Sequence, residues 1–411
     1  MRGISTKALL LAGALAIAAG PASAATIVLN NLGGVEPGSD AARGFRAAAE
    51  FWSRKISNDI TVHLDVGFDH LGEDILGSTG SSVGVVLTQD VYQGLKANQH
   101  SALDATAVAN LQPLHQSDFG AGIGAISMVT PGYTGSTGGV GFGIDTDNPI
   151  LDDGGDFNNV LLGSTTANLK ALGLITDQSM VDGDITFSSD FAFDFNPTDG
   201  ITAGQSDFIA VAIHEIGHAL GFVSAVDDYD FLGLPNGPAA FENCADAGQP
   251  AFNCSDYPVN ETWWGYTGDL FRYDKTGELD WNPGDPNYFS VDGGQTNLAL
   301  FSTGAFNGDT WQGSHWKAPV AAPFCSGLLG ILNPYSCSGA VGLITGMDFA
   351  YFDAIGYNFN FGFDANDGTL FSSADAYGAV PEPGAWALML MGFGLVGAAV
   401  RRRRRGLAAA V

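Results

Sequence analysis

Basic residues are scarce in this chain. Its 411 residues include 16 Lys and Arg against 44 Asp and Glu, which gives a formal net charge of -28 at pH 7. A surface this acidic repels phosphate backbones and anionic lipid, so the composition argues against nucleic acid and membrane surfaces as partners. It is typical of a protein that stays soluble outside the cell.

Calcium binding by carboxylates is an alternative use of this acidity. One stretch is dense enough to raise it, with Asp145, Asp147, Asp152, Asp153 and Asp156. The spacing of these residues is not that of a calcium-binding loop. Ca2+ is therefore a second candidate cofactor, behind the metal considered below.

Cysteine is also rare, with four residues in the whole chain. Cys244, Cys254, Cys325 and Cys337 allow three pairings, and proximity in the sequence favours Cys244–Cys254 and Cys325–Cys337 as disulfides within two loops. None of the four stands in a C-x-x-C pair, so a structural zinc site built from cysteines is not expected.

Long uninterrupted apolar runs occur only near the two ends of the sequence. Residues 1–24 contain Arg2 and Lys7, an apolar run over 8–19, and then Ala22-Ser23-Ala24. This pattern predicts a secretory signal peptide that is cleaved after Ala24. The exported protein would then meet the oxidising compartment that disulfides need.

The opposite end combines Pro381-Glu382-Pro383, an apolar run over 385–400 and five arginines over 401–405. An apolar run of this length is near the short limit for a membrane span, and the arginines would hold its end in the cytoplasm. Residues 381–411 resemble the PEP-CTERM sorting signal of Gram-negative bacteria. The resemblance implies recognition by an exosortase in the inner membrane, removal of the tail, and secretion or attachment to the cell surface. A permanent anchor is the simpler alternative.

Strand and helix patterns alternate through the first half of the chain. Strands are predicted at 26–29, 60–68, 83–87, 185–189 and 191–195, an amphipathic helix at 41–56, short helices at 101–111 and 165–172, and mixed strand and loop at 120–143. This mixture predicts an α+β lobe with a mixed sheet over residues 25–222. The pattern over residues 223–360 predicts a second, loop-rich lobe with a helix at 347–357. Residues 361–380 are expected to form a linker.

The most informative stretch is an apolar helix over 212–222 that carries His214, Glu215 and His218. Two histidines four residues apart stand on the same face of a helix, where both imidazoles can reach one metal ion. This is the zinc motif H-E-x-x-H, in which the glutamate acts as a general base on water. Ser206 is a plausible N-cap of the helix, and Gly221 permits a left-handed end. The competing interpretation is that both histidines are ordinary core residues.

The segment 214–222 resembles the active-site helix of the metzincin zinc peptidases. In most of these families the third zinc ligand falls three residues after the glycine, where this chain has Ser224, a residue with the wrong chemistry. Asp227 has suitable chemistry and lies soon after the turn. From the residues alone, Asp227 stays a competitor for the third ligand position. Its neighbours Asp228 and Asp230 equally suggest a solvated acidic loop or a calcium site.

Two later segments, 313–317 and 344–350, resemble those of leishmanolysin-like peptidases, in which the third histidine follows a long insertion. The resemblance implies that His315 completes the zinc site. It also implies a Met-turn beneath the metal, which residues 330–334 would form with Leu332 in the place of the methionine. The implied fold is a metzincin-like catalytic domain of two lobes that face each other across a cleft.

These observations lead to a secreted zinc endopeptidase that acts on protein or peptide substrates. His214, His218 and His315 would hold Zn2+, and Glu215 would serve as general base and proton donor. Residues 187–195 would supply an edge strand for the substrate, and Tyr335 or Tyr357 would stabilise the oxyanion. Two alternatives are a non-catalytic surface or matrix protein on a decayed zincin fold, and a zinc hydrolase acting on a non-peptide amide.

Overall fold

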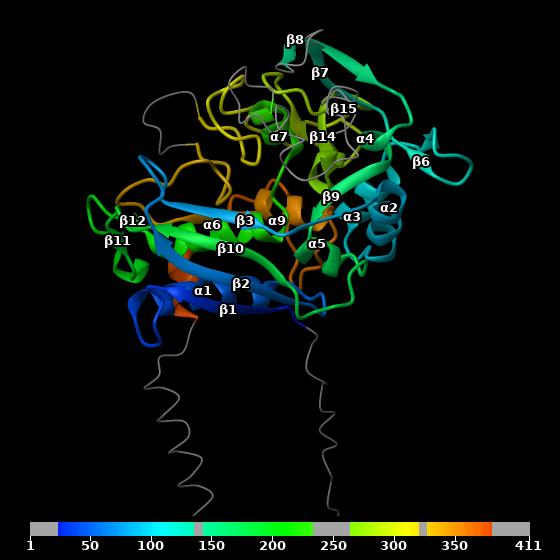
Figure 1. The fold of residues 1–411 in the computed structure, drawn as a ribbon. Coiled ribbons are helices and arrows are strands. Elements are labelled where there is room, and N and C mark those ends of the chain that lie inside the picture. The colour runs from blue at the N-terminus through cyan, green and yellow to red at the C-terminus, as the bar shows by residue number, and fades with distance from the viewer. Residues whose placement is uncertain (1–23, 135–142, 233–263, 320–326, 380–411) are drawn as a thin grey trace, which may run out of the picture.

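A four-stranded mixed sheet, in the order β1-β2-β10-β3, organises the first half of the chain. The computed structural model describes residues 24–134, 143–232, 264–319 and 327–379. The strands are β1 (Thr26–Gly33), β2 (Thr61–Asp69), β10 (Val181–Ser188) and β3 (Gly77–Ser81). The first three are parallel, and β3 runs antiparallel to β10 (Figure 1). The prediction of a mixed sheet is confirmed.

The edge of this sheet differs from the prediction. Residues 187–195 were expected to form the edge strand. Their first two residues end β10, which lies between β2 and β3. Of the others, only Phe193–Asp194 (β11) form a strand, which pairs with β12 (Ser206–Asp207). The edge is β3, a Gly-Ser-Thr segment without apolar alternation. The prediction was wrong because strand order depends on long-range pairing, which the local pattern of a strand does not encode.

Helix α1 (Asp40–Lys55) packs against the sheet and against α6 (Phe208–Leu220). Ser39 caps α1 by accepting a hydrogen bond from the backbone N–H of Ala42 at 3.1 Å. Gly44 allows the two helices to approach, since a Cβ there would lie 2.4 Å from the ring of Phe208. The indole N–H of Trp52 donates to the backbone carbonyl of Ile213 at 3.1 Å, which fixes α6 from behind.

Two further sheets lie beside the first. A three-stranded sheet has the order β13 (Gly265–Tyr266), β9 (Leu161–Thr165) and β4 (Val83–Leu87). A six-stranded sheet has the order β17 (Ala299–Leu300), β16 (Tyr288–Phe289), β14 (Arg272–Lys275), β15 (Glu278–Asp280), β7 (Met128–Thr134) and β8 (Gly143–Asp152). In Figure 1 the latter occupies the end of the molecule opposite β1. A short pair, β5 (His115–Gln116) and β6 (Gly124–Ala125), lies at its side.

The remaining helices of the first half are short. They are α2 (Thr88–Ala97), α3 (Ala102–Ala109), α4 (Phe157–Val160) and α5 (Thr166–Ala171), with a 3-10 turn η1 (Pro197–Asp199). The predicted helices at 101–111 and 165–172 are therefore confirmed within a few residues. Ser101, at the first predicted helical position, is the N-cap of α3 and forms a capping box with Asp104.

The second half of the described chain is poor in long elements, as predicted. It contains α7 (Ala225–Leu232), which the sequence did not indicate, a 3-10 helix η3 (Thr267–Phe271), and α9 (Gly346–Ala354). Strand β18 (Leu343–Thr345) pairs with β19 (Thr369–Ser372), and α10 (Ser373–Gly378) follows. Residues 369–378 lie within the expected linker, yet Ser373 and Ala376 are buried, so this part is packed rather than a linker.

Much of the disulfide prediction lies outside the described residues. Cys337 is disulfide-bonded, while Cys244, Cys254 and Cys325 lie in segments that are not described. The predicted signal peptide over 1–23 and the tail over 380–411 also lie outside the described residues.

Candidate metal centre

Helix α6 carries the first two candidate ligands and is almost wholly buried. Its N-cap is Asp207, whose carboxylate accepts a hydrogen bond from the backbone N–H of Ala210 at 3.0 Å, so the predicted cap at Ser206 was one residue early. Gly221 ends the helix with φ of 122°, as predicted for a left-handed end. The chain then turns back, and the backbone N–H of Phe222 bonds the carbonyl of Gly217 at 3.1 Å.

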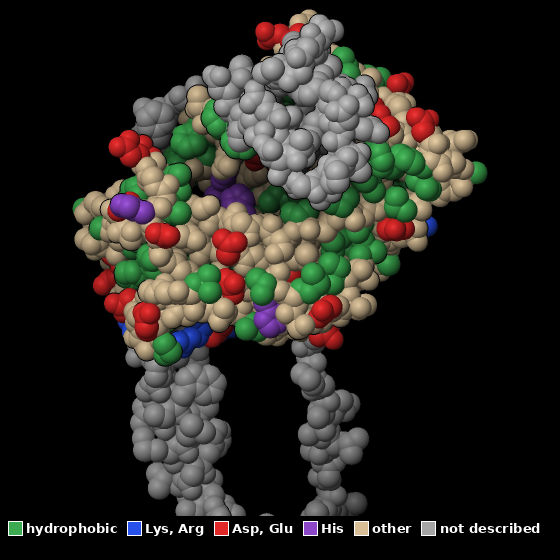
Figure 2. All heavy atoms as spheres, viewed as in Figure 1, with side chains coloured by type: hydrophobic (Ala, Val, Ile, Leu, Met, Phe, Trp, Pro, Cys, Tyr) green, Lys and Arg blue, Asp and Glu red, His purple; other side chains and the backbone are tan. Residues whose placement is uncertain are grey.

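The structure brings His214, His218 and His315 together although the last two lie 97 positions apart in sequence. The Nε2 atoms of His214 and His218 are 2.9 Å apart, and those of His214 and His315 are 3.3 Å apart. His315 comes from the loop between β17 and β18. A hollow on the face drawn in Figure 2 contains histidine side chains.

Each of the three imidazoles is oriented by a backbone carbonyl at its Nδ1 atom. The Nδ1 of His214 lies 2.8 Å from the oxygen of Ile331, and that of His218 lies 2.7 Å from the oxygen of Phe222. The Nδ1 of His315 lies 3.3 Å from the oxygen of Gln312. A carbonyl only accepts, so each Nδ1 carries the proton, and each Nε2 of a neutral ring presents a lone pair to the centre.

Burial disfavours the charged form of two of these rings. It lowers the pKa of His218 to about 3, and His214 nearby adds to the effect. Burial also holds the pKa of His315 well below its ordinary value, helped by His218 and His214. Three neutral nitrogens whose lone pairs converge repel one another unless a cation lies between them.

The donor set fits zinc. Three imidazole nitrogens with a further position open to water are typical of catalytic Zn2+ sites, whereas Ca2+ prefers oxygen ligands. Within the described ranges, this triad is the only group of three or more His, Cys, Asp or Glu residues whose ligand atoms all lie within 4.8 Å of one another. Asp152, in the acidic stretch considered for calcium, accepts hydrogen bonds from Asn158 and Asn159 at 2.8 and 3.1 Å.

Glu215 stands beside the triad and is 5% exposed. Burial raises the pKa of Glu215, against the opposing effects of His214 and a hydrogen bond from Thr79. Thr79 lies on β3 and donates to the carboxylate Oε2 at 2.7 Å. The general base of the predicted mechanism therefore faces the edge strand of the first sheet.

Asp227 and Ser224, both considered as third ligands, instead hold the loop of His315. The Asp227 carboxylate accepts from the backbone N–H groups of Gly313 and Ser314 at 2.5 and 2.9 Å, and from the Ser314 hydroxyl. The backbone N–H of Ser224 donates to the Ser314 hydroxyl at 3.0 Å. Burial raises the pKa of Asp227 to about 6, and these hydrogen bonds oppose the rise.

A buried ion pair supports the same loop from behind. Arg272 donates to the carbonyl of Gly313 at 2.5 Å and lies 3.3 Å from the Asp269 carboxylate. Asp269 in turn accepts from the Ser224 hydroxyl at 2.6 Å and the backbone N–H of Ala225 at 2.8 Å. Both charged side chains are buried, and together they connect η3 and β14 to the start of α7.

A second buried carboxylate, Asp348 of α9, organises the turn that contacts His214. It accepts from the backbone N–H groups of Ile331 and Leu332 at 2.9 and 3.4 Å, and from the indole N–H of Trp316 at 2.9 Å. Leu332 is fully buried, and a Cβ at Gly217 would lie 3.1 Å from its side chain. Leu332 thus forms the apolar floor under α6, where the resemblance places a methionine.

The two tyrosines proposed for the oxyanion have different surroundings. Tyr357 is fully buried, and its ring packs against Phe352 at a centroid distance of 6.0 Å. A side chain without surface cannot contact a substrate, so the assignment of Tyr357 was wrong. Tyr335 is half-buried and packs against Trp311, four residues before His315, at 5.6 Å. Tyr335 stays a candidate.

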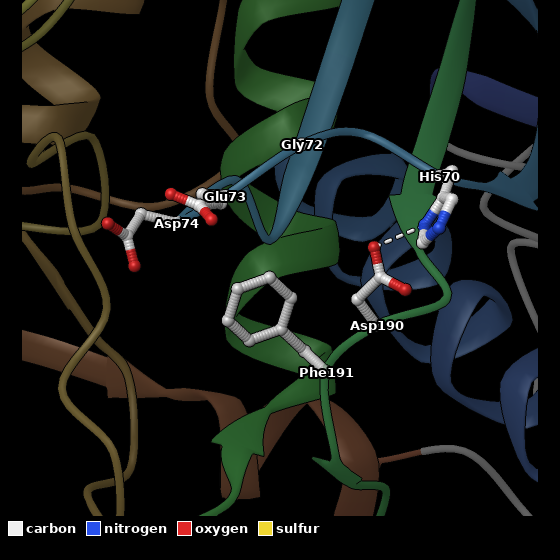
Figure 3. Close-up of a pocket in the computed structure, with 6 residues that line it drawn as sticks. All are labelled: His70, Gly72, Glu73, Asp74, Asp190 and Phe191. Atoms are coloured by element: carbon white, nitrogen blue, oxygen red, sulfur yellow. Dashed lines mark ion pairs between the residues drawn. The ribbon is translucent and has the colours of Figure 1, made fainter.

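A separate pocket opens near the start of β3. It has a volume of about 590 Å³ and is lined by His70, Gly72, Glu73, Asp74, Asp190 and Phe191. Figure 3 shows His70 turned toward Asp190, with which it forms an ion pair through Nδ1 and Oδ2. None of the triad lines this pocket. It is not the metal centre.

Sequence reasoning missed Thr79, Arg272, Asp269 and Asp348. Each acts through hydrogen bonds to segments far away in sequence, and no local pattern marks such a residue. The only available signal was an acidic residue within an apolar helix, as at Asp348, where an unpaired buried charge would be costly.

Comparison with known proteins matches one part of the chain. Residues 379–405 match the PEP-CTERM protein-sorting motif. No curated protein and no solved structure matches the chain. The motif implies recognition by exosortase-type sorting machinery, and it indicates an extracellular or cell-surface protein of Gram-negative bacteria with a membrane-anchoring C-terminus.

Among the described residues, no single helix is both long and apolar enough to cross a bilayer. Helices α6 and α7 reach the necessary length and hydropathy only as a pair, with a 90° bend between them. Because α6 is buried against α1 and β3, it is a core helix.

Proposed function

We propose that this protein is an extracytoplasmic zinc-dependent endopeptidase with a metzincin-like catalytic domain. One observation carries the proposal. The three Nε2 atoms of His214, His218 and His315 converge, while every Nδ1 faces a backbone carbonyl. An ordinary cluster of core histidines has no reason to turn three lone pairs toward one point.

The residues of the site fit the chemistry of peptide hydrolysis. When bound, Zn2+ would lower the pKa of a coordinated water and polarise the scissile carbonyl. Glu215 takes a proton from the attacking water and passes it to the leaving amine. Tyr335 would hydrogen-bond the oxygen of the polarised carbonyl, provided that the substrate lies between it and the triad.

Strand β3 offers a way to align an extended substrate. In the described structure β3 pairs with β10 on one side only, and Thr79 on this strand contacts Glu215. A peptide that adds to the free edge would pass the general base in an extended conformation. This role replaces the one expected of residues 187–195.

The test is metal analysis combined with peptide-library cleavage by the mature protein. We expect about one zinc per chain, and hydrolysis that a chelator abolishes and added zinc restores. The Glu215→Gln variant should keep its zinc, but its kcat should fall at least about 100-fold because the base is lost. Zinc binding without any hydrolysis would favour the decayed, non-catalytic alternative. Hydrolysis that survives in Glu215→Gln would refute the assigned base.

A further inference from the structure

The edge strand β3 binds the Glu215 carboxylate through Thr79 and passes close to it at Gly77. Thr79 donates its hydroxyl to Oε2 at 2.7 Å. Gly77 lies beside the other oxygen, since a Cβ on this residue would be 2.7 Å from Oε1 and 3.1 Å from the carboxyl carbon. Positions 77 and 79 are two residues apart, so they share one face of the strand.

The hydrogen bond from Thr79 is selective. A hydroxyl carries one proton, and Thr79 has two acceptors in range, the carboxylate Oε2 at 2.7 Å and the backbone oxygen of Glu215 at 3.0 Å. The carboxylate is the closer acceptor and the one that bears charge when ionised. In the described part of the chain, Thr79 is the only hydrogen-bond donor to the Glu215 carboxylate, so Oε1 is the oxygen left to receive a proton.

A close fit at Gly77 limits the movement of Oε1. The atoms nearest to a Cβ at position 77 all belong to the Glu215 side chain, so a methyl group there would displace the carboxylate. The remaining residues of β3 continue this contact, since the Ser81 hydroxyl donates to the backbone oxygen of His218 at 3.2 Å. The carboxylate is thus confined between its own helix and the strand.

We infer that Thr79 and Gly77 are positioning residues for the general base. This inference rests on the proposed function. Thr79 fixes Oε2 and thereby aims Oε1 at the water, while Gly77 leaves the space that Oε1 requires. A general base must stay within hydrogen-bond reach of the proton that it abstracts, and the rate of proton transfer falls when a flexible glutamate can turn away from the water. The same strand therefore aligns both base and substrate.

The experiment uses the zinc-loaded mature protein and a good peptide substrate. Thr79→Val removes the hydroxyl but keeps the shape, and we expect about 10- to 100-fold lower kcat, with KM and zinc content within about twofold of the parent. Thr79→Ser keeps the hydroxyl and should restore kcat to within about threefold. Gly77→Ala places a methyl group where Oε1 lies, and it should lower kcat without loss of zinc.

Matched controls lie on the neighbouring strands of the same sheet. Thr186→Val on β10 repeats the first substitution at a residue paired with Ser78, on the face opposite Thr79. Gly67→Ala on β2 repeats the glycine substitution where the nearest atom would be 3.4 Å away, an ordinary contact. Both variants should keep the kcat of the parent protein.

Two kinetic results would overturn the inference. The first is a kcat within twofold of the parent in both Thr79→Val and Gly77→Ala. The second is a Thr79→Ser variant as slow as Thr79→Val, which would assign the effect to packing. Crystal structures of the zinc-loaded variants give a readout without activity. They should show a displaced Glu215 carboxylate, and an unmoved one contradicts the inference even if the parent hydrolyses nothing.

Discussion

His315 and Asp227 lie close together in the structure but do different work. His315 supplies a nitrogen to the triad, whereas both oxygens of Asp227 accept hydrogen bonds from Gly313 and Ser314, just before the histidine. The carboxylate therefore sets the position of the loop that carries His315. Its influence on metal binding should be real but indirect.

We predict different zinc affinities for the two alanine variants. His315→Ala removes a ligand and should abolish stoichiometric binding in a competition titration with a chromophoric chelator. Asp227→Ala leaves all three ligands and should weaken binding by about 10- to 100-fold, the usual effect of losing a supporting contact. An Asp227 variant that loses zinc while the His315 variant keeps it would reverse the assignment. Asp118→Ala, an exposed carboxylate, serves as control.

Asp353 on α9 shows how a buried carboxylate couples stability to pH. It is 2% exposed, and burial together with the nearby Asp104 raises its pKa from 3.8 to about 7, although Ser101 donates a hydrogen bond at 2.6 Å. When the pKa of a carboxyl is higher in the folded than in the unfolded protein, its contribution to stability is fully present at pH values below the unfolded-state pKa. This contribution is lost as the pH rises through the folded value.

Asp353→Asn should therefore stabilise the protein only at high pH. The amide is neutral and its oxygen can still accept from Ser101. We expect an increase of about 1–3 kcal/mol in the free energy of unfolding at pH near 8.5, and almost none at pH near 4. Urea unfolding at the two pH values measures this, with Asp118→Asn as control. An equal effect at both would show that packing, not ionisation, is responsible.

At the scale of elements, the sequence predicted what local chemistry determines. The helix over 41–56, the left-handed end at Gly221 and the strand at 83–87 all depend on neighbours within a few residues. The N-cap was missed by one position because Ser206 and Asp207 are both good caps. Helix α7 was missed because its acidic first turn also suits a loop.

The order of strands and the supports of the candidate site could not be predicted in this way. The edge strand β3 is made of Gly, Ser and Thr, so it lacks the alternation by which a strand is found. The central helix motif indicated two histidines and the base, and family resemblance indicated His315. Asp348 and Arg272 bind backbone groups from distant segments, and only the folded chain brings these together.

Leu332 connects two elements, the turn at 330–334 and helix α6. It is fully buried beneath Gly217. Leu332→Ala would leave a cavity under the helix and should cost about 2–5 kcal/mol in the free energy of unfolding. Leu332→Met conserves volume and should cost less than about 1.5 kcal/mol.

Denaturant unfolding of the chelator-treated and zinc-loaded protein tests this prediction. If the turn is the floor of the centre, Leu332→Ala should weaken zinc binding as well as folding, while Leu332→Met changes neither much. An alanine variant with unchanged stability would place the floor elsewhere.

At the scale of the whole molecule, the matched motif predicts proteolytic processing. Expressed in a bacterium with the sorting machinery, the protein should lose the residues from near Pro381 onward, because the motif covers 379–405. Intact-mass spectrometry of the mature protein measures the new end. Mature protein that still carries the arginines at 401–405 would indicate a permanent anchor instead.

The two ends of the described chain share one side of the molecule, away from the triad. The backbone N–H of Ala25 bonds the carbonyl of Ile56 at 3.2 Å, and the guanidinium of Arg54 donates to the carbonyl of Ala379 at 2.9 Å, so both ends meet at the end of α1. Strand β1 borders this side, whereas β3 lies about 14 Å away across the sheet (Figure 1). A tether that follows residue 379 would therefore attach the protein on the side away from the histidine triad. Cleavage of that tether would release the protein from the membrane and leave the arrangement of the three histidines unchanged.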